Sequence, residues 1–598
     1  MASVKDWSRF AKGEILRPGI AMNLYSAAQY VLFVVIVTAC VRPLGGYMHR
    51  VFAGQRTALD RLCIPVERWL YRLAGVDAAE EMSAGRYLIC FVVFSLVGTL
   101  LLYCLLRSQR ILPWFFPAYQ TTPLTSDLSF NTAISFATTT TWQAYAGENT
   151  MSYFSQMVGL CTQNFLAGAS GLAVGIAFIR GLSRESCATL GNFWVDLTRG
   201  LLWILLPGAL VGSLLLAGQG VPMNFHPYTV AHALEGTTQI IPQGPVAALE
   251  IIKNLGTNGG GFFNANGAHP YENPAPLTNF LELLSIVLLP AALTNTFGRM
   301  VGYQRQGWLL YWVMLILFIG GLYALHLSEQ QSNPLIHTDA TRGADSRSGW
   351  LQSGGNMEGK EVRFGIGGTA LAGVVTSNTA TGSANAADDS FTSLGGLVLL
   401  VNLLLGEVIF GGLGTGIFSM IMTAAIAVFL AGLMIGRTPE YLGKQIGPNE
   451  NKMIVLYALT GPVTILILTA IAIGAKAGLA GLTTNSGPHG LTEILFGFAS
   501  SFANNGQAFA GLNANTPFYN ILTAIAMLAG RFGLAIPALM FAGMFARQKG
   551  RPQSRGTLRT DTFTFGVLLT TFLIIVTALS YLPVLTLGPV LEHLLFNI

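Results

Sequence analysis

Charged residues are scarce in this sequence. Only 10% of the 598 residues are Asp, Glu, Lys or Arg, whereas soluble domains average about 25%. Hydrophobic residues make up 52% of the chain, and the mean hydropathy is +0.54. This balance excludes a soluble enzyme of this length, a disordered chain and a nucleic-acid-binding protein. Most of the chain must therefore lie in a membrane.

Sequence motifs for nucleotide binding, phosphorylation and metal binding are also missing. The chain has no Gly-x-x-x-x-Gly-Lys-[Ser/Thr] loop, no Asp-Lys-Thr-Gly sequence and no His-Glu-x-x-His. The nearest candidate, residues 436–444, has the wrong spacing for a phosphate-binding loop. None of the six cysteines forms Cys-x-x-Cys, so we interpret them as small apolar residues. The sequence predicts no catalytic site and no bound nucleotide in this chain.

Long apolar segments dominate what is present. A helix needs about 20 apolar residues to cross a bilayer, and ten segments qualify: 22–44, 86–106, 152–179, 197–217, 278–298, 307–328, 392–436, 453–475, 517–545 and 561–585. Backbone N–H and C=O groups without a hydrogen-bond partner are too costly in lipid, so each segment must span as a helix. We therefore expect an all-α integral membrane protein. The seventh segment is unusually long and contains a cluster of glycines: Gly411, Gly412, Gly414 and Gly416. We expect one broken helix there, with two short spans as the alternative.

The distribution of Lys and Arg predicts the orientation of the chain. The loops within 42–86, 180–199, 299–306, 437–452 and 547–559 hold 20 of these residues, against 12 on the opposite side. The first set is therefore expected in the cytoplasm, and both termini on the outer side. Residues 1–21 carry four basic residues and no apolar core, so they are no signal peptide. Because an outer basic tail contradicts the charge rule, we hypothesise that translation starts at Met22.

Four outer loops share one pattern: an apolar stretch too short to span, followed by small polar residues and glycine. Their polar turns recur at a nearly fixed spacing, 118 residues from Thr141 to Gly259, 123 from there to Gly382, and 124 from there to Gly506. A fixed period indicates repeated units. The predicted units are residues 86–180, 197–299, 307–436 and 453–546, with one extra helix at each end, 22–44 and 561–585.

The chemistry of such a unit favours a cation. A short re-entrant helix directs its negative carbonyl end at the polar turn. Glycine allows a left-handed backbone, so successive carbonyl groups can face one axis and replace the hydration shell of an ion. No carboxylates lie in the turns, which favours a monovalent over a divalent ion. The alternative, four ordinary surface turns, is weakened by their regular spacing.

The polar turns and several neighbouring segments resemble a known family. Residues 131–136, 254–266, 406–412, 436–444 and 501–507 are similar to the potassium-binding A chain of the Kdp potassium-transporting ATPase, a P-type pump of the bacterial inner membrane. The resemblance extends from about Met22 to the C-terminus. It implies a two-span potassium-channel fold repeated four times, K+ as the transported ion, and a P-type ATPase B subunit, a C subunit and a small F subunit as partners within the lipid membrane.

The resemblance also implies which residues form the potassium filter: Thr138, Thr139, Thr140, Thr141, Gln143, Thr257, Asn258, Gly259, Ala380, Thr381, Gly382, Asn504, Asn505 and Gly506. Two of the four turns depart from the family pattern. Thr139 and Thr141 stand where the family commonly has Asn, and Ala380-Thr381 where it has Ser-Cys. Both changes are tolerable if backbone carbonyl groups bind the ion.

Further candidates lie outside the filter. The glycine-rich break is expected to form a flexible loop that blocks direct exit below the filter, although a simple kink is the alternative. Arg531 lies within a span, where a charge indicates function; it could pair with Glu407, hold the loop through its carbonyl groups, or snorkel to the interface. Arg437 and Glu440 could contact the ATPase partner, or lie in a solvated loop.

Together these features predict a non-catalytic, channel-like subunit that takes up outer K+ and delivers it to a P-type ATPase. A stand-alone potassium channel or symporter with the same four repeats is the first alternative. The second is a structural subunit whose glycine turns bind no ion.

Overall fold

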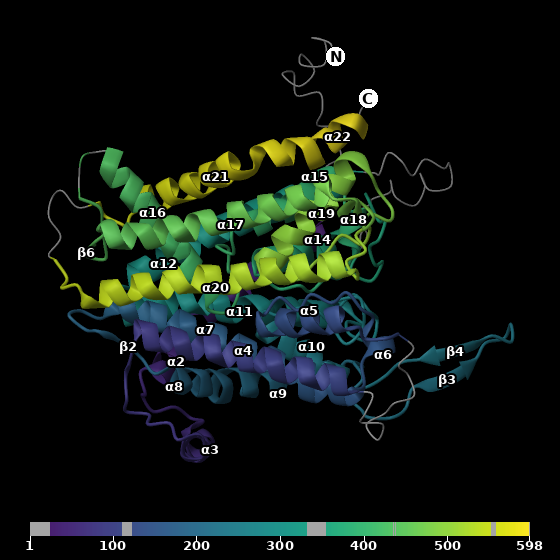
Figure 1. The fold of residues 1–598 in the computed structure, drawn as a ribbon, viewed down its shortest axis with the longest axis horizontal. Coiled ribbons are helices and arrows are strands. Elements are labelled where there is room, and N and C mark those ends of the chain that lie inside the picture. The colour runs from purple at the N-terminus through teal and green to yellow at the C-terminus, as the bar shows by residue number, and fades with distance from the viewer. Residues whose placement is uncertain are drawn as a thin grey trace, which may run out of the picture.

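A computed structural model describes residues 24–109, 122–331, 355–434, 436, 438–551 and 558–596. The predicted extension 1–21, Met22 and Arg437 lie outside these residues. Long helices run side by side along the long axis of the molecule, and short strands and helices lie at its two ends (Figure 1). Within the described residues, ten helices are long and apolar enough to cross a membrane. This confirms the all-α membrane fold.

The ten spans follow the predicted segments closely. Seven of them are single α-helices: α2 (Leu24–Phe52), α4 (Ala84–Ser108), α11 (Pro276–Met300), α12 (Gln304–Glu329), α16 (Thr415–Met434), α17 (Pro448–Gly474) and α20 (Pro517–Arg547). The third span consists of the π-helical η2 (Ser155–Cys161) and α7 (Thr162–Ser183), and the fourth of α8 (Phe193–Arg199), η3 (Gly200–Leu205) and α9 (Leu206–Gly218). The last span is α21 (Phe563–Leu585), which η5 (Thr586–Val590) and α22 (Leu591–Phe596) extend.

The seventh predicted segment is interrupted, as expected. Helix α15 (Ser393–Leu404) ends well before α16 begins at Thr415. The break runs over residues 405–414, so it starts earlier than the glycine cluster, and Gly416 is already helical. The chain needs left-handed backbone at both ends of this loop, with φ of +80° at Gly406 and +92° at Gly414, which explains the glycines there.

Four short helices lie between successive spans: α5 (Ser126–Ala137), α10 (Val246–Leu255), α14 (Gly365–Asn378) and α19 (Gly487–Phe502). The longest has 16 residues, about 24 Å at 1.5 Å per residue, so none crosses the bilayer. Each packs against both flanking spans, as α10 does against α9 and α11. The order of span, short helix and span therefore occurs four times along the chain.

The first and last spans lie outside this arrangement. Helix α2 packs along α11, where Gly45 closely approaches Ala292 and Asn295, and α21 packs against α12 and α16. The most buried spans are α7 and α11, with 83% and 78% of their apolar windows buried inside the protein. The core of the bundle is therefore the set of helices that carry and surround the four short helices.

Short elements occupy the ends of the bundle. One end carries α6 (Gly147–Thr150), the hairpin of β3 (Thr229–His232) and β4 (Thr238–Ile241), η4 (Asp388–Ser390) and α18 (Lys476–Leu479). The opposite end carries α3 (Asp60–Ala74), the pair β1 (Met82–Ser83) and β2 (Thr189–Gly191), and the pair β5 (Glu440–Tyr441) and β6 (Lys444–Gln445). These elements were not predicted, because they are short and lie between the strong apolar signals.

Candidate functional site

Four polar turns begin at the same distance from the four short helices. Those helices end at Ala137, Leu255, Asn378 and Phe502. Among the predicted filter residues, the triplets 139–141, 257–259, 380–382 and 504–506 each start two residues later, and Thr138 and Gln143 of the predicted first turn lie outside them. The four repeats therefore present equivalent triplets at equivalent places, although the residues in them differ.

The backbone alternates in handedness in three of these triplets, and in the other, 380–382, only the first residue is left-handed. The first and third residues of the turn at 257–259 have φ of +52° and +87°, and those of the turn at 504–506 have +49° and +98°. Thr139 and Thr141 show the same pattern, with +68° and +51°, and Ala380 has +51°. Alternation of left- and right-handed residues turns successive carbonyl groups to the same side of the chain, the arrangement that coordinates a dehydrated ion.

Three middle residues direct their amide groups away from that side. The N–H groups of Asn258, Thr381 and Asn505 donate to carbonyl groups five residues earlier in their short helices, at N···O distances of 2.8, 3.4 and 2.9 Å. The first turn differs, since Thr141 donates to Ser135 at 3.1 Å. Because the amide donors are used in this way, the face that remains for an ion consists of oxygen atoms.

The four turns meet one another in chain order. Gly259 and Gly382 form an isolated parallel bridge, with the Gly382 N–H donating to Asn258 at 3.4 Å. A side chain at Gly382 would collide with the Asn505 carbonyl group, and one at Gly506 with that of Thr140. A side chain at Gly260 would meet the methyl group of Thr141. The second turn thus contacts the third, the third contacts the fourth, the fourth contacts the first, and the first contacts the second. The four turns therefore close a ring.

Side chains brace every junction of this ring. Between turns 1 and 2, Gln143 donates to the Gly261 carbonyl group at 3.0 Å and accepts from the Gly261 N–H at 2.8 Å. At the other three junctions, the Ser383 hydroxyl donates to the side-chain oxygen of Asn254 at 2.8 Å, the Gln507 amide donates to the Ser383 carbonyl group at 2.9 Å, and the Asn504 amide donates to the Thr140 hydroxyl at 3.0 Å. Thr138 lies just before its triplet and caps α5 by donating to Ile134 at 2.9 Å. Gln143 and Thr138 thus support the ring from outside the triplets.

A buried charged cluster behind the second turn was missed in the sequence. Lys253 is fully buried in α10; its ammonium donates to the Gly260 carbonyl group at 2.5 Å and pairs with Glu250 at 2.9 Å. The carboxylate of Glu272 accepts from the N–H groups of Phe262, Phe263 and Gly267. Burial raises the pKa of Glu272 to about 8, although Lys253 acts against this shift. A Lys three residues from Glu within an apolar stretch was the available signal.

The loop of the broken helix lies directly against the ring. The Leu413 N–H donates to the Thr257 hydroxyl at 2.7 Å, and a side chain at Gly412 would lie 3.5 Å from Ala380. Gly414 abuts the carbonyl group of Gly171 in α7. Residues 405–414 therefore occupy the space beside the second and third turns, on the side toward α16.

Arg531 lies beside the first turn, in the middle of α20. It is 4% exposed and donates to the Ala167 carbonyl group and the Ser170 hydroxyl at 3.0 Å, and to the Thr139 hydroxyl at 3.3 Å. Its contacts are with α7 and the ring, so the snorkelling alternative is wrong. Among the ion pairs of the described residues, none joins Arg531 to Glu407, which accepts from Thr415 at 2.6 Å instead.

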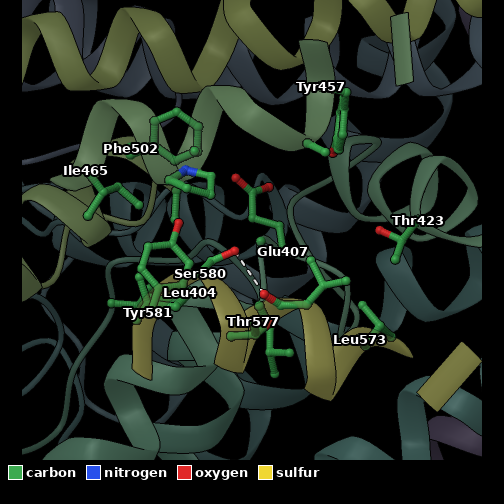
Figure 2. Close-up of a pocket in the computed structure, with 18 of the residues that line it drawn as sticks. Leu404, Glu407, Thr423, Tyr457, Ile465, Phe502, Leu573, Thr577, Ser580 and Tyr581 are labelled. Carbon is green, nitrogen blue, oxygen red and sulfur yellow. Dashed lines mark hydrogen bonds between the residues drawn. The ribbon is translucent and has the colours of Figure 1, made fainter. Parts of the chain in front are cut away.

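A mostly apolar cavity of about 110 Å³ adjoins the fourth turn. It is lined by Phe502 and Ala503, which directly precede Asn504, and by residues of the break, α16, α17 and α21. Glu407 points toward this space, and Tyr457 and Thr423 lie along its edge (Figure 2). The cavity thus lies beside the ring, between spans.

The segment that follows α16 packs onto the end of α7. Lys444 in β6 donates to the carbonyl groups of Gly181, Leu182 and Arg184 at the end of α7, where the helix dipole favours a cation. Glu440 lies half-buried in β5. The loop is thus folded onto α7, and a contact of Glu440 with a partner remains a prediction.

Comparisons with known proteins give a consistent result. The family model described as the potassium-transporting ATPase A subunit matches residues 31–594. A potassium-transporting ATPase potassium-binding subunit of Methylorubrum extorquens is 51% identical over 572 residues, 96% of this chain and 98% of the relative. The subunit of the same description from Solibacter usitatus is 50% identical over 576 residues, 96% and 99% of the two chains. A solved structure of the potassium transporter TrkH from Vibrio parahaemolyticus aligns with 86% of this chain and 97% of its own, at 13% identity and a TM-score of 0.48.

Proposed function

Since this chain belongs to the potassium-transporting ATPase A subunit family, we propose that it binds K+ within the ring of four turns and delivers the ion to the ATPase subunit of the same complex. It is the potassium-binding, non-catalytic subunit of that assembly. The ion arrives from the outer side, loses its water among the backbone oxygens, and leaves toward the partner that hydrolyses ATP.

One observation carries this proposal: four equivalent triplets close a ring of backbone oxygens. Alternating φ values in three of the triplets and the mutual contacts of all four support a common centre for the oxygens. The four short helices end at the triplets, so their negative ends face that centre. A dehydrated monovalent cation is the ligand that such a site binds best, because each water molecule it loses is replaced by a fixed carbonyl dipole.

The route below the ring follows from the broken helix. Residues 405–414 lie against the second and third turns, so a straight path through the bundle is blocked. The cavity beside Ala503 offers the ion a lateral exit past Glu407 (Figure 2). A lateral exit suits a subunit that must pass the ion to a neighbour and must not let it flow down its gradient.

The partners and the location are part of the same proposal. The complex contains a P-type ATPase B subunit, a C subunit and a small F subunit, and lies in the bacterial inner membrane. The excess of Lys and Arg in five loops supports a cytoplasmic position for those loops and an outer position for both termini. Energy for uptake comes from the B subunit, so this chain binds K+ and no nucleotide.

Gly259→Asp tests the site directly. A side chain at this position would strike Gly382, and its charge would disturb the oxygens of two turns. We expect at least a tenfold loss of apparent K+ affinity, which corresponds to about 1.4 kcal/mol, in the K+-stimulated ATPase activity of the intact complex. Gly218→Asp, at an exposed position with no neighbour within 4 Å, is the control. Unchanged K+ dependence in the correctly assembled Gly259→Asp complex would refute the proposed site.

Two measurements separate the alternatives. The purified chain in liposomes should carry no steady K+ flux, whereas a stand-alone channel or symporter would carry one. The chain should also be stabilised against heat by K+ more than by Na+ at equal ionic strength, by about 2.7 kcal/mol when K+ exceeds its dissociation constant a hundredfold. Equal melting temperatures in the two salts would favour a structural subunit that binds no ion.

A further inference from the structure

Helix α3 has three distinct faces. Asp60, Cys63 and Glu67 face the protein, with Glu67 paired to Arg199 at 3.1 Å and Asp60 accepting from Trp203 at 2.9 Å. The other two faces carry different kinds of exposed residue. An apolar stripe consists of Leu62, Val66, Trp69 and Leu73, and a basic stripe of Arg61, Arg68 and Arg72.

The apolar stripe is open over the whole length of the helix. Leu62 and Leu73 are each 73% exposed, and Trp69 is 61% exposed. Their spacing of three and four residues places them on one side of the helix. Exposed apolar side chains in a continuous row indicate contact with another apolar phase or molecule.

The basic stripe adjoins the apolar one and carries no compensating acid. Within the described part of the chain, no ion pair involves Arg61, Arg68 or Arg72. Both acidic residues of α3, Asp60 and Glu67, are turned toward the protein. The free surface of the helix is therefore apolar and positive, which suits an apolar layer bordered by negative charges.

The position of α3 identifies that layer. Its contacts Arg199, Leu202 and Trp203 lie six to ten residues into the fourth span, which begins at Phe193, about 9–15 Å along the helix axis. In Figure 1, α3 lies off the side of the bundle near the ends of α2 and α8. It therefore flanks the wall of the bundle close to one end, at the depth where headgroups meet acyl chains.

We propose that α3 is an interfacial helix that binds anionic phospholipid, with Leu62, Val66, Trp69 and Leu73 inserted among the acyl chains and Arg61, Arg68 and Arg72 on the lipid phosphates. Helices of this composition bury their apolar face about 5–10 Å deep in the interface. Each arginine near an anionic surface favours binding about fivefold. The helix would thus gather negatively charged lipid around the first, second and fourth spans.

Quenching of Trp69 by brominated lipid tests the insertion. The full chain, alone and in the assembled complex, is placed in vesicles of phosphatidylcholine with phosphatidylglycerol. The Trp69 signal is the difference between wild type and Trp69→Phe. Lipid brominated close to the headgroup should quench about half of it or more, at the shallow depth of an interfacial helix. A tryptophan introduced by Ile316→Trp, at an exposed position in the middle of α12, is the matched control, and its signal should be quenched best by lipid brominated deep in the chains.

A second set of vesicles tests the choice of lipid. When only phosphatidylglycerol carries bromine, Trp69 should be quenched at least fivefold more efficiently than when only phosphatidylcholine does. The variant R61Q/R68Q/R72Q should lose this preference, and high salt should weaken it. Two results would overturn the proposal: a Trp69 signal that no brominated lipid quenches, and a signal quenched in the isolated chain but protected in the complex. The second would mean that a protein partner covers the stripe.

Discussion

Five residues in the four turns adopt a left-handed backbone without being glycine. They are Thr139, Thr141, Thr257, Ala380 and Asn504. Such a conformation costs about 1–2 kcal/mol for each residue with a β-carbon. The structure around the ring must therefore hold it in place, and the side-chain braces at all four junctions do so. This also explains why Ala380 and Thr381 are acceptable in the third turn, since the ring uses their backbone and not their side chains.

Lys253 supports the second turn through a single contact with the Gly260 carbonyl group. We predict that Lys253→Met lowers apparent K+ affinity at least fivefold, because Gly260 loses its only charged donor and shifts relative to Thr141. Stability should fall by about 3–5 kcal/mol, since Glu250 is left buried and unpaired. Potassium-dependent ATPase activity and thermal unfolding of the complex measure the two effects.

The double variant Lys253→Met/Glu250→Gln separates these effects. Removing the orphaned carboxylate should restore part of the stability, whereas the affinity should stay low because Gly260 remains unsupported. If affinity recovered together with stability, Lys253 would be a structural residue of the bundle with no particular influence on the ring.

At the scale of elements, one side-chain hydrogen bond joins the loop of the broken seventh span to the ring. The Thr257 hydroxyl accepts from the Leu413 N–H at 2.7 Å and so joins the loop to the second turn. In Thr257→Val that buried N–H loses its partner, at a cost of about 1–3 kcal/mol. We predict that the loop opens at least fivefold more often and that the isolated chain leaks K+ from liposomes, measured with a potassium electrode.

Thr369→Val is the matched control for this change. Thr369 is buried in α14, and its hydroxyl has no hydrogen-bond partner among the described residues. The same substitution there should cause no leak. The apparent K+ affinity of the Thr257→Val complex should stay close to that of the wild type, because the backbone oxygens are unchanged. A tight Thr257→Val chain, or an equal leak from both variants, would show that the loop is not the barrier.

The sequence predicted the long apolar elements better than the loops and short helices between them. The second short helix, Val246–Leu255, occupies the apolar stretch that precedes the second polar turn, one of the four such stretches that the sequence predicted. The break was predicted from the cluster between Gly411 and Gly416, so its predicted start is six residues too late. The glycine that marks the true start, Gly406 with its left-handed backbone, was overlooked. Helix α3 was not predicted, although its apolar stripe is regular, because its 15 residues are too few and too polar to form the long apolar run of a span.

At the scale of the whole molecule, the ring depends on contacts between distant parts of the chain. Gly506 meets Thr140 although 366 residues separate them. The repeat spacing predicted that four equivalent turns exist, but the residues of a turn do not determine which of the other turns it contacts. For the same reason the sequence left the partner of Arg531 open, and the structure places it on α7 and Thr139 rather than on Glu407.

A second long-range junction joins three parts of the molecule at the end that carries η4. His489 at the start of α19 contacts Asp389 of the third repeat at 2.9 Å, Glu592 of α22 at 2.9 Å and Glu493 of its own helix at 3.7 Å. These three carboxylates surround one imidazole, so the junction is strong only while His489 is protonated. The C-terminal helix is thereby tied to the third and fourth repeats by a titratable contact.

This junction predicts a loss of stability at alkaline pH. Burial alone would lower the pKa of His489, but the hydrogen bonds and charges of Asp389 and Glu592 raise it from 6.5 to about 10. The folded protein therefore binds this proton more tightly than the unfolded chain does. Its contribution is complete below about pH 6.5 and disappears as the pH rises through about 10; it amounts to about 5 kcal/mol at most.

Thermal unfolding of the complex at a series of pH values tests this. The wild type should lose stability steadily between the two pKa values, whereas His489→Gln should start less stable and stay level over the same range. His593→Gln, which removes the neighbouring histidine of α22, should retain the slope of the wild type, because His489 keeps its contacts with Asp389, Glu592 and Glu493. Parallel curves for the wild type and His489→Gln would mean that the imidazole is neutral in the folded protein and that packing alone, with no charge, holds α22 against the repeats.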